Sequence, residues 1–150
     1  MSATNEIRKH LLIQAPQSRV WRAITDSAQF GAWFKVRLES PFVVGQTTSG
    51  QITHKGWEHV RFTLRTEAIE PETRFAYRWH PYAIDMSKDY SSEPMTLVEF
   101  LLEPQDGGTL VTVVESGFDR LPPERIDEAF RMNERGWEEQ LRNVQAHVAA

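Results

Sequence analysis

The stretch RIDEAFRMNERGWEEQLRNVQAHV, residues 125–148, decides the fold. Its large apolar residues follow one another at spacings of 4, 7, 4, 3 and 4 positions: Ile126, Phe130, Trp137, Leu141, Val144 and Val148. This spacing places them on one face of a long helix. Pro122 and Pro123 lie just before it and favour a helix start, because the first helical N–H groups have no partner within the helix. The helix therefore needs one large apolar surface to cover its face.

The segments upstream of this helix supply that surface, because most of them alternate between apolar and polar residues as half-buried strands do. The clearest example runs from Trp57 to Ile69, where Val60, Phe62 and Leu64 alternate with polar residues. Similar patterns predict strands over 6–14, 36–38, 75–79, 95–103 and 109–116, with a further strand toward residue 52. A Gly-rich connection at 105–108 predicts a hairpin between the last two. Two short helices, from Pro16 to Thr25 and over 28–33, follow the first strand.

This order predicts an α+β fold in one domain, residues 1–150. About six to seven antiparallel strands form one curved sheet, and the C-terminal helix covers its concave face. A single helix is too narrow to fill a strongly curved sheet, so we expect an internal cavity lined mainly by apolar and aromatic groups.

Composition excludes several classes of function. The 17 Lys and Arg residues are outnumbered by 21 Asp and Glu, and the net charge of −4 carries no basic cluster, which argues against nucleic-acid binding. Without Cys there is no thiol nucleophile or thiolate metal site. No apolar stretch is long enough for stable membrane insertion, and residues 1–14 lack the apolar core of a signal peptide. We therefore expect a soluble cytoplasmic protein.

Three motifs carry a family resemblance that runs from Ile7 to Val148. APQSRVWRAITDSAQFGAWF (15–34), LVEFLLEPQDGGTLVTVVESGF (97–118) and RMNERGWEEQLRNVQAHV (131–148) occur in this order. Together they resemble the START/Bet v 1-like (SRPBCC) superfamily, and within it bacterial proteins similar to the C-terminal domain of the Hsp90 ATPase activator. The resemblance implies a helix-grip fold with a hydrophobic pocket between the sheet and the long helix.

Two features depart from that family pattern. The eukaryotic co-chaperone carries a separate N-terminal domain for which this chain, with its first strand starting at Glu6, leaves no room. An Hsp90-type chaperone is therefore the less favoured of the two expected partner classes, after a small molecule. The polar loop over 81–94 is longer than a minimal family hairpin, and we expect it to cap the mouth of the pocket.

The predicted ligand-binding residues are mostly aromatic side chains on faces that should point inward. Ordinary core packing is the alternative interpretation for each ring, and Trp21 and Trp57 look more like packing residues. The full set comprises Trp33, Phe62, Tyr77, Trp79, Glu115, Phe130, Asn133 and Trp137.

Glu115 is the most informative polar residue of this set. It has the same strand parity as Val111 and Val113, which we assign inward, and a carboxylate in an apolar cavity needs a partner or a raised pKa. Candidate partners are Arg78, His80 and His59, although strand parity turns the first two outward. In the alternative interpretation, which we favour, Glu115 near the end of its strand simply reaches water.

Two residues of the long helix have both a structural and a ligand-related interpretation. Gly136 costs about 1 kcal/mol relative to Ala within a helix, so either close packing beneath Trp137 or space for a ligand should offset it. We favour close packing. Asn133 lies among apolar residues and either orients a ligand or caps a sheet carbonyl, of which we favour the structural role.

No motif predicts a catalytic residue, a metal site or a cofactor. His54, His59 and His80 lack an HExxH pattern or a carboxylate-backed cluster. No GxSxG elbow marks a nucleophile, and no Gly-rich loop follows a strand to open a helix.

The resulting hypothesis is a non-enzymatic protein that binds a small hydrophobic, amphipathic or lipid-like molecule in its cavity. One alternative is an enzyme similar to polyketide cyclases and aromatases of the superfamily, with Glu115 as general acid or base and Tyr77 or His59 assisting. The other is an Hsp90 co-chaperone-like interaction module.

Overall fold

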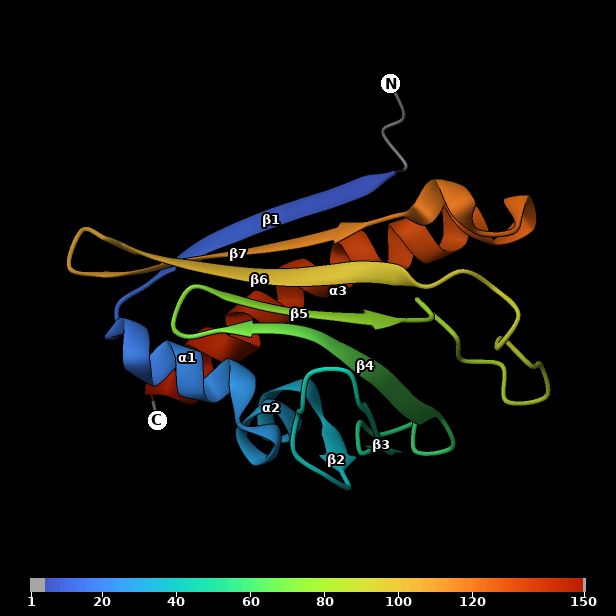
Figure 1. Ribbon diagram of the computed structural model, residues 1–150, viewed down its shortest axis with the longest axis horizontal. Helices are drawn as coiled ribbons and strands as arrows, with labels where there is room; N and C mark the ends of the chain where they lie inside the picture. The colour runs from blue at the N-terminus through green and yellow to red at the C-terminus, as the bar shows by residue number, and fades with distance from the viewer. Residues whose placement is uncertain (1–4, 150) are drawn as a thin grey trace.

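A computed structural model describes residues 5–149 and contains one seven-stranded sheet and three α-helices (Figure 1). In chain order the elements are β1 (Glu6–Ile13), α1 (Gln17–Thr25), α2 (Ser27–Phe34), β2 (Val36–Leu38), β3 (Thr47–Ile52), β4 (Arg61–Glu70), β5 (Arg74–Trp79), β6 (Thr96–Gln105), β7 (Gly108–Ser116), a 3₁₀ turn (Phe118–Arg120) and α3 (Pro123–Ala149). The strand order across the sheet is β1-β7-β6-β5-β4-β3-β2, with antiparallel neighbours. This confirms the predicted α+β helix-grip architecture.

The predicted strand from Trp57 to Ile69 begins too early. The chain turns over 53–60, where the Val60 N–H donates to the Trp57 carbonyl, and β4 begins only at Arg61. From there the expected alternation holds, since Phe62, Leu64 and Thr66 are buried while the intervening residues are more exposed. The correction moves Trp57 from a strand into a connecting segment.

The β6–β7 hairpin closes through a two-residue turn. Asp106 and Gly107 both have positive φ, 49° and 79°, between the paired residues Gln105 and Gly108. Two consecutive left-handed residues match the right-handed twist of the flanking strands, and an Asp-Gly pair tolerates that conformation at low cost. The predicted hairpin is confirmed, and it fixes the register that places Glu115 on the inner face.

Helix α3 crosses one face of the sheet and covers the core (Figure 1). Its buried residues are Ala129, Trp137, Leu141 and Val144, which confirms the predicted apolar face. Helices α1 and α2 close one end of the same core with residues that include Val20, Ile24 and Phe30.

Aromatic rings fill the centre of the molecule. Phe30 is fully buried, and its ring centroid lies 4.7 to 6.4 Å from those of five neighbours: Trp33, Phe34, Phe42, Phe62 and Tyr77. Trp137 is also buried and continues the cluster onto α3. Side chains thus fill the space between the middle of the sheet and α3, where we expected an internal cavity, and open space lies to the side of this core.

The first strand forms one edge of the sheet and also contacts the last helix. Residues Ile7 to Ile13 of β1 pair with Glu115 to Thr109 of β7. On the other side of β1, the Lys9 ammonium donates to the Glu138 carboxylate of α3 at 2.8 Å and lies 3.6 Å from that of Glu134. The chain's first and last regular elements are therefore in direct contact.

Candidate functional site

The candidate site is built around a buried carboxylate, that of Glu115. The Glu115 side chain is fully buried, and both its oxygens accept hydrogen bonds. Oε2 accepts from Trp79 Nε1 at 2.7 Å and Thr96 Oγ1 at 2.5 Å, and Oε1 accepts from Trp137 Nε1 at 2.8 Å and Asn133 Nδ2 at 2.9 Å. We call these five residues the Glu115 node.

Three adjacent strands and α3 assemble this node. Trp79 of β5 is paired with Thr96 of β6, and Glu115 of β7 is paired with Val98, two residues farther along β6. All three side chains point to the inner face near the same end of the sheet. Helix α3 brings Asn133 and Trp137, which lie one turn apart and therefore face the same way.

The node corrects both sequence-based ideas about Glu115. The side chain does not reach water. None of the charged or imidazole groups considered is its partner: Arg78 pairs with Glu67, the His80 ring contacts the carbonyl of Glu93, and His59 is exposed. All four donors are uncharged side chains. Burial raises the pKa of Glu115, and the four hydrogen bonds to the ionised form oppose this rise only in part.

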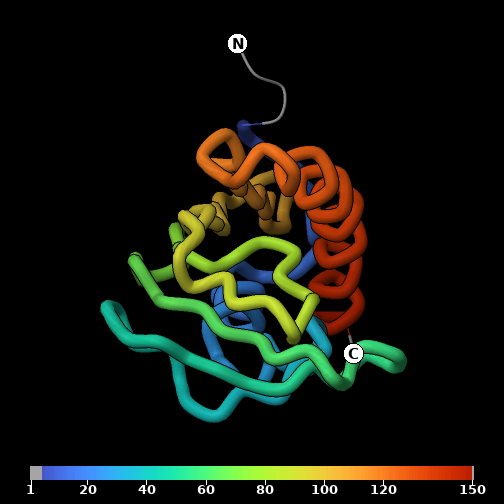
Figure 2. Tube along the Cα trace, turned by 90° about the vertical axis from the view of Figure 1, so that its right-hand side faces the viewer, coloured from blue at the N-terminus to red at the C-terminus, as the bar shows by residue number. Residues whose placement is uncertain are grey.

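An open groove beside the node is lined by residues of α3, the 81–94 loop and the connection between β3 and β4. Figure 2 shows the backbone course of these three segments. Its section along α3 has a volume of about 450 Å³, and a neighbouring section under the loop has about 540 Å³. Phe34, Tyr82 and Asn133 line both sections. This volume is in the range of small-molecule sites.

The two walls of the groove differ in chemistry. One wall is formed by α3, whose Asn133, Gly136, Gln140 and Asn143 follow one another at spacings of 3, 4 and 3. The facing wall is mainly apolar and aromatic: Phe34, Ile52, Trp57, Val60, Tyr82 and Ile84. The same section is also lined by Met132 and Glu139 of α3 and by Lys35 and His54. We call Asn133, Gln140 and Asn143 of the first wall the amide stripe.

Gly136 gives the groove its width on the helix side. A Cβ atom added there would meet no heavy atom within 4 Å, so the helix is not packed closely at this point. The prediction of close packing beneath Trp137 is therefore wrong. Trp57, which we interpreted as a packing residue, lines the groove as well.

The predicted binding residues divide into three groups. Phe62, Trp79, Asn133 and Trp137 line parts of the groove. Trp33, Tyr77 and Glu115 are buried behind it, with the Trp33 indole donating to the Ala23 carbonyl at 2.7 Å. Phe130 packs edge-on against Phe118 outside the groove. Sequence reasoning missed Thr96, Gln140 and Asn143, although the helical spacing of the last two from Asn133 is a signal that could have found them.

Residues 14–149 match the family described as Activator of Hsp90 ATPase homolog 1-like protein. The chain belongs to this family. No relative was found among curated proteins.

Solved structures share the fold of this family member at low sequence identity. A protein from Mesorhizobium loti superposes with a TM-score of 0.75 at 19% identity, with 96% of each chain covered. The Aha1 dimer from Colwellia psychrerythraea gives 0.70 at 17% identity, with 95% of each chain covered. DynU16, a protein of the dynemicin biosynthetic locus, gives 0.74 at 21% identity over 97% of this chain. This chain spans about half, 48%, of DynU16.

Arg125, near the start of α3 in this family member, fastens the 81–94 loop over the groove. Its guanidinium donates to the carbonyls of Pro81 at 2.9 Å and Tyr82 at 3.2 Å, and to the Glu93 carboxylate at 3.0 Å. It also lies 4.8 Å from the centre of the Tyr90 ring. Arg125 and Glu93 are only 10% and 7% exposed, so the contact is largely shielded from water. The loop is thus a fixed wall of the groove.

Tyr77 gives a prediction about stability. Its phenol group is buried and has no hydrogen-bond partner among residues 5–149, and burial together with the charge of Glu115 raises its pKa well above the ordinary value. Because an unpaired buried hydroxyl costs about 1–3 kcal/mol, Tyr77→Phe should raise the free energy of unfolding by about 1 kcal/mol. Urea unfolding measures this change. A loss of stability would show that the hydroxyl has a stabilising partner.

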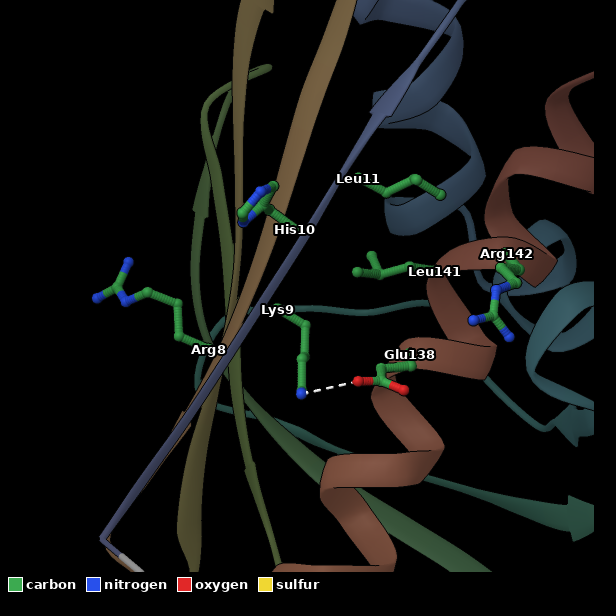
Figure 3. A pocket seen from close by; sticks show the side chains of 7 residues that line it. All are labelled: Arg8, Lys9, His10, Leu11, Glu138, Leu141 and Arg142. Carbon is green, nitrogen blue, oxygen red and sulfur yellow. Dashed lines mark hydrogen bonds and ion pairs between the residues drawn. The ribbon is translucent and has the colours of Figure 1, made fainter. Parts of the chain in front are cut away.

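A smaller pocket of about 250 Å³ lies between β1 and α3 (Figure 3). Figure 3 shows Lys9 pointing toward Glu138, while Arg8 extends away from the helix. The hydrogen bond to Glu138 raises the pKa of Lys9. The contact between Lys9 and Glu138 in this pocket thus joins β1 to α3.

Within residues 5–149, no three acidic or His side chains gather closely enough to hold a metal ion, and no helix is long and apolar enough to cross a membrane.

Proposed function

We propose that this protein binds a small hydrophobic or amphipathic molecule in the groove and catalyses no reaction on it. The observation that carries the proposal is the pairing of an aromatic wall with the amide stripe across a gap that Gly136 keeps open. Sites for small molecules commonly combine apolar surface with a few polar groups in this way.

Apolar contact would supply most of the affinity. Covering about 200 Å² of ligand surface contributes about 5 kcal/mol before the costs of association and ordering. The walls also change little on binding, since the Glu115 node holds Trp79 and Trp137 in place and Arg125 holds the loop. Because the groove is already formed, the protein loses less conformational entropy when a ligand binds.

The position of Glu115 favours binding over the enzymatic alternative. That alternative would use Glu115 as a general acid or base with Tyr77 assisting. An ionised carboxylate offers about four acceptor sites, and four donors occupy them here. Glu115 and Tyr77 are both fully buried, so a molecule in the groove meets neither reactive oxygen.

Filling the groove at Gly136 tests the proposal. Gly136→Leu should weaken binding of 1-anilinonaphthalene-8-sulfonate by at least about tenfold, because the new side chain occupies the space now open beside Asn133 and Trp137. Titrations followed by probe fluorescence measure the dissociation constant.

The matched control is Ala146→Leu, which adds an exposed leucine on the same helix outside the groove. It should leave probe binding unchanged. Gly136→Ala should raise the free energy of unfolding by about 1 kcal/mol, which separates helix propensity from groove filling. Equal probe affinity in Gly136→Leu, Ala146→Leu and the unmodified protein would reject the groove as the binding site.

A further inference from the structure

The amide stripe is a row of uncharged hydrogen-bonding groups on the groove side of α3. Asn133, Gln140 and Asn143 are half-buried and line the groove section beside the gap at Gly136. Because their spacing follows the helical repeat, their side chains project from one face. Which of their atoms are free decides which chemical groups a ligand must carry.

The orientation of the Asn133 amide follows from chemistry. Its Nδ2 donates to Glu115 Oε1 at 2.9 Å, and an ionised carboxylate only accepts hydrogen bonds. The amide oxygen therefore points away from the node. No donor among residues 5–149 reaches that oxygen, and it is not among the buried polar atoms that lack a partner. Asn133 thus offers the groove a hydrogen-bond acceptor.

Gln140 and Asn143 leave one donor group and one acceptor free. Asn143 Nδ2 donates to Gln140 Oε1 at 3.0 Å. This leaves the amide nitrogen of Gln140 and the amide oxygen of Asn143 for other partners. If both amides were turned over, the pair would still leave one NH₂ group and one oxygen. The stripe therefore alternates acceptors with a donor.

The aromatic side of the node contributes no polar atoms to the groove. The indole N–H groups of Trp79 and Trp137 both donate to Glu115, so these residues present carbon surface to a ligand. Their ring centroids lie 5.8 Å apart, and Phe34 lies 6.1 Å from Trp79 and 6.5 Å from Trp137. Flat apolar surface suits an aromatic ring.

We propose, resting on the function proposed above, that the ligand is a flat aromatic molecule with uncharged hydroxyl groups along one edge. Its ring lies against Phe34 and Trp79, and its hydroxylated edge faces Asn133, Gln140 and Asn143. A hydroxyl both donates and accepts, so it satisfies a row that mixes acceptors with a donor. A carboxylate accepts only and an ammonium donates only, and each would leave part of the row unpaired.

Two probes with the same ring system test this inference: 2,7-dihydroxynaphthalene and 2,7-dimethoxynaphthalene. The dimethoxy compound keeps the ring and the acceptor oxygens and lacks the donors. In ligand-observed NMR titrations, the dihydroxy compound should bind at least about tenfold more tightly. In Gln140→Leu with Asn143→Leu, which leaves the Glu115 node intact, this preference should fall to less than about threefold while the dimethoxy compound still binds.

The outcomes separate this inference from the proposed function. Equal affinities for the two probes, both abolished by Gly136→Leu, would overturn the hydroxylated edge and retain the groove as a binding site. A preference that persists in the double variant would also overturn it, because the selecting groups would lie elsewhere. Failure of both probes and of 1-anilinonaphthalene-8-sulfonate to bind the unmodified protein would overturn the proposed function itself.

Discussion

Glu115→Gln should lower the free energy of unfolding by about 3 kcal/mol. Glutamine has nearly the same shape, but it replaces one acceptor oxygen with an NH₂ group. That group would face two of the four donors in the Glu115 node, and each unpaired buried donor costs about 1–3 kcal/mol. Urea unfolding followed by tryptophan fluorescence measures the loss, and also reports on Trp79 and Trp137.

Glu99→Gln is the matched control for this change. Glu99 lies on the neighbouring strand β6, where its 23% exposed side chain accepts from Arg74 at 2.8 Å. The same chemical replacement there should cost less than about 1 kcal/mol, since partly exposed ion pairs contribute little. If the two variants lost equal stability, the node would have no special energetic role.

The pH dependence of the Glu115→Gln effect has a definite sign. Because burial raises the pKa of Glu115 in the folded state, the folded protein holds this proton more tightly than the unfolded chain does. Its contribution to stability is fully present below the unfolded pKa and is lost as pH rises through the folded pKa. The stability difference between the unmodified protein and Glu115→Gln should therefore shrink from about pH 4 upward. A difference that grew with pH would mean that the hydrogen bonds outweigh burial.

Arg125→Met should release the 81–94 loop. The change keeps a long side chain with good helix propensity but removes the donors to two loop carbonyls and to the buried Glu93 carboxylate. Charge-assisted hydrogen bonds contribute about 1.5–3 kcal/mol each, so local opening should become easier by about 2 kcal/mol. Amide hydrogen exchange over 82–93 should accelerate by about 30-fold.

Lys88→Met distinguishes the specific contacts of Arg125 from a general loss of positive charge near the loop. Lys88 contacts the same Glu93 carboxylate at 3.3 Å, but its side chain is 39% exposed. Hydrogen exchange in this variant should change by less than about threefold, as expected for an exposed ion pair. Equal acceleration in the two variants would contradict a special role for Arg125.

The architecture was predictable because its determinants are local in the sequence. The spacing from Ile126 to Val148 reports one buried helical face, and alternation around Phe62 and Val111 reports strands with one buried face. Asp106 and Gly107 mark the hairpin turn. The start of β4 was misplaced because Val60 continues the alternation of Phe62 and Leu64, while the backbone N–H groups of Trp57 and Val60 close turns instead.

The candidate site was predictable only in part. Strand parity correctly turned Glu115 inward, but its donors come from β5, β6 and α3, and their approach depends on how the helix crosses the sheet. Charged partners were predicted for Glu115, whereas neutral indole, hydroxyl and amide groups donate hydrogen bonds to its carboxylate. The predicted position of the binding space was wrong for a related reason. Gly136 borders open space that only the placement of the surrounding loops creates.

The pairing of β1 with β7 has a consequence for synthesis on the ribosome. Ile13 leaves the exit tunnel early, but its partner Thr109 emerges about 100 residues later, which takes roughly 5–20 s at ordinary rates of translation. Throughout that interval β1, an edge strand of the finished sheet, has no neighbouring strand to pair with, and Leu11 and Ile13 remain exposed on a nascent chain. Chaperones that shield short apolar segments would therefore act on this protein before its last helix exists.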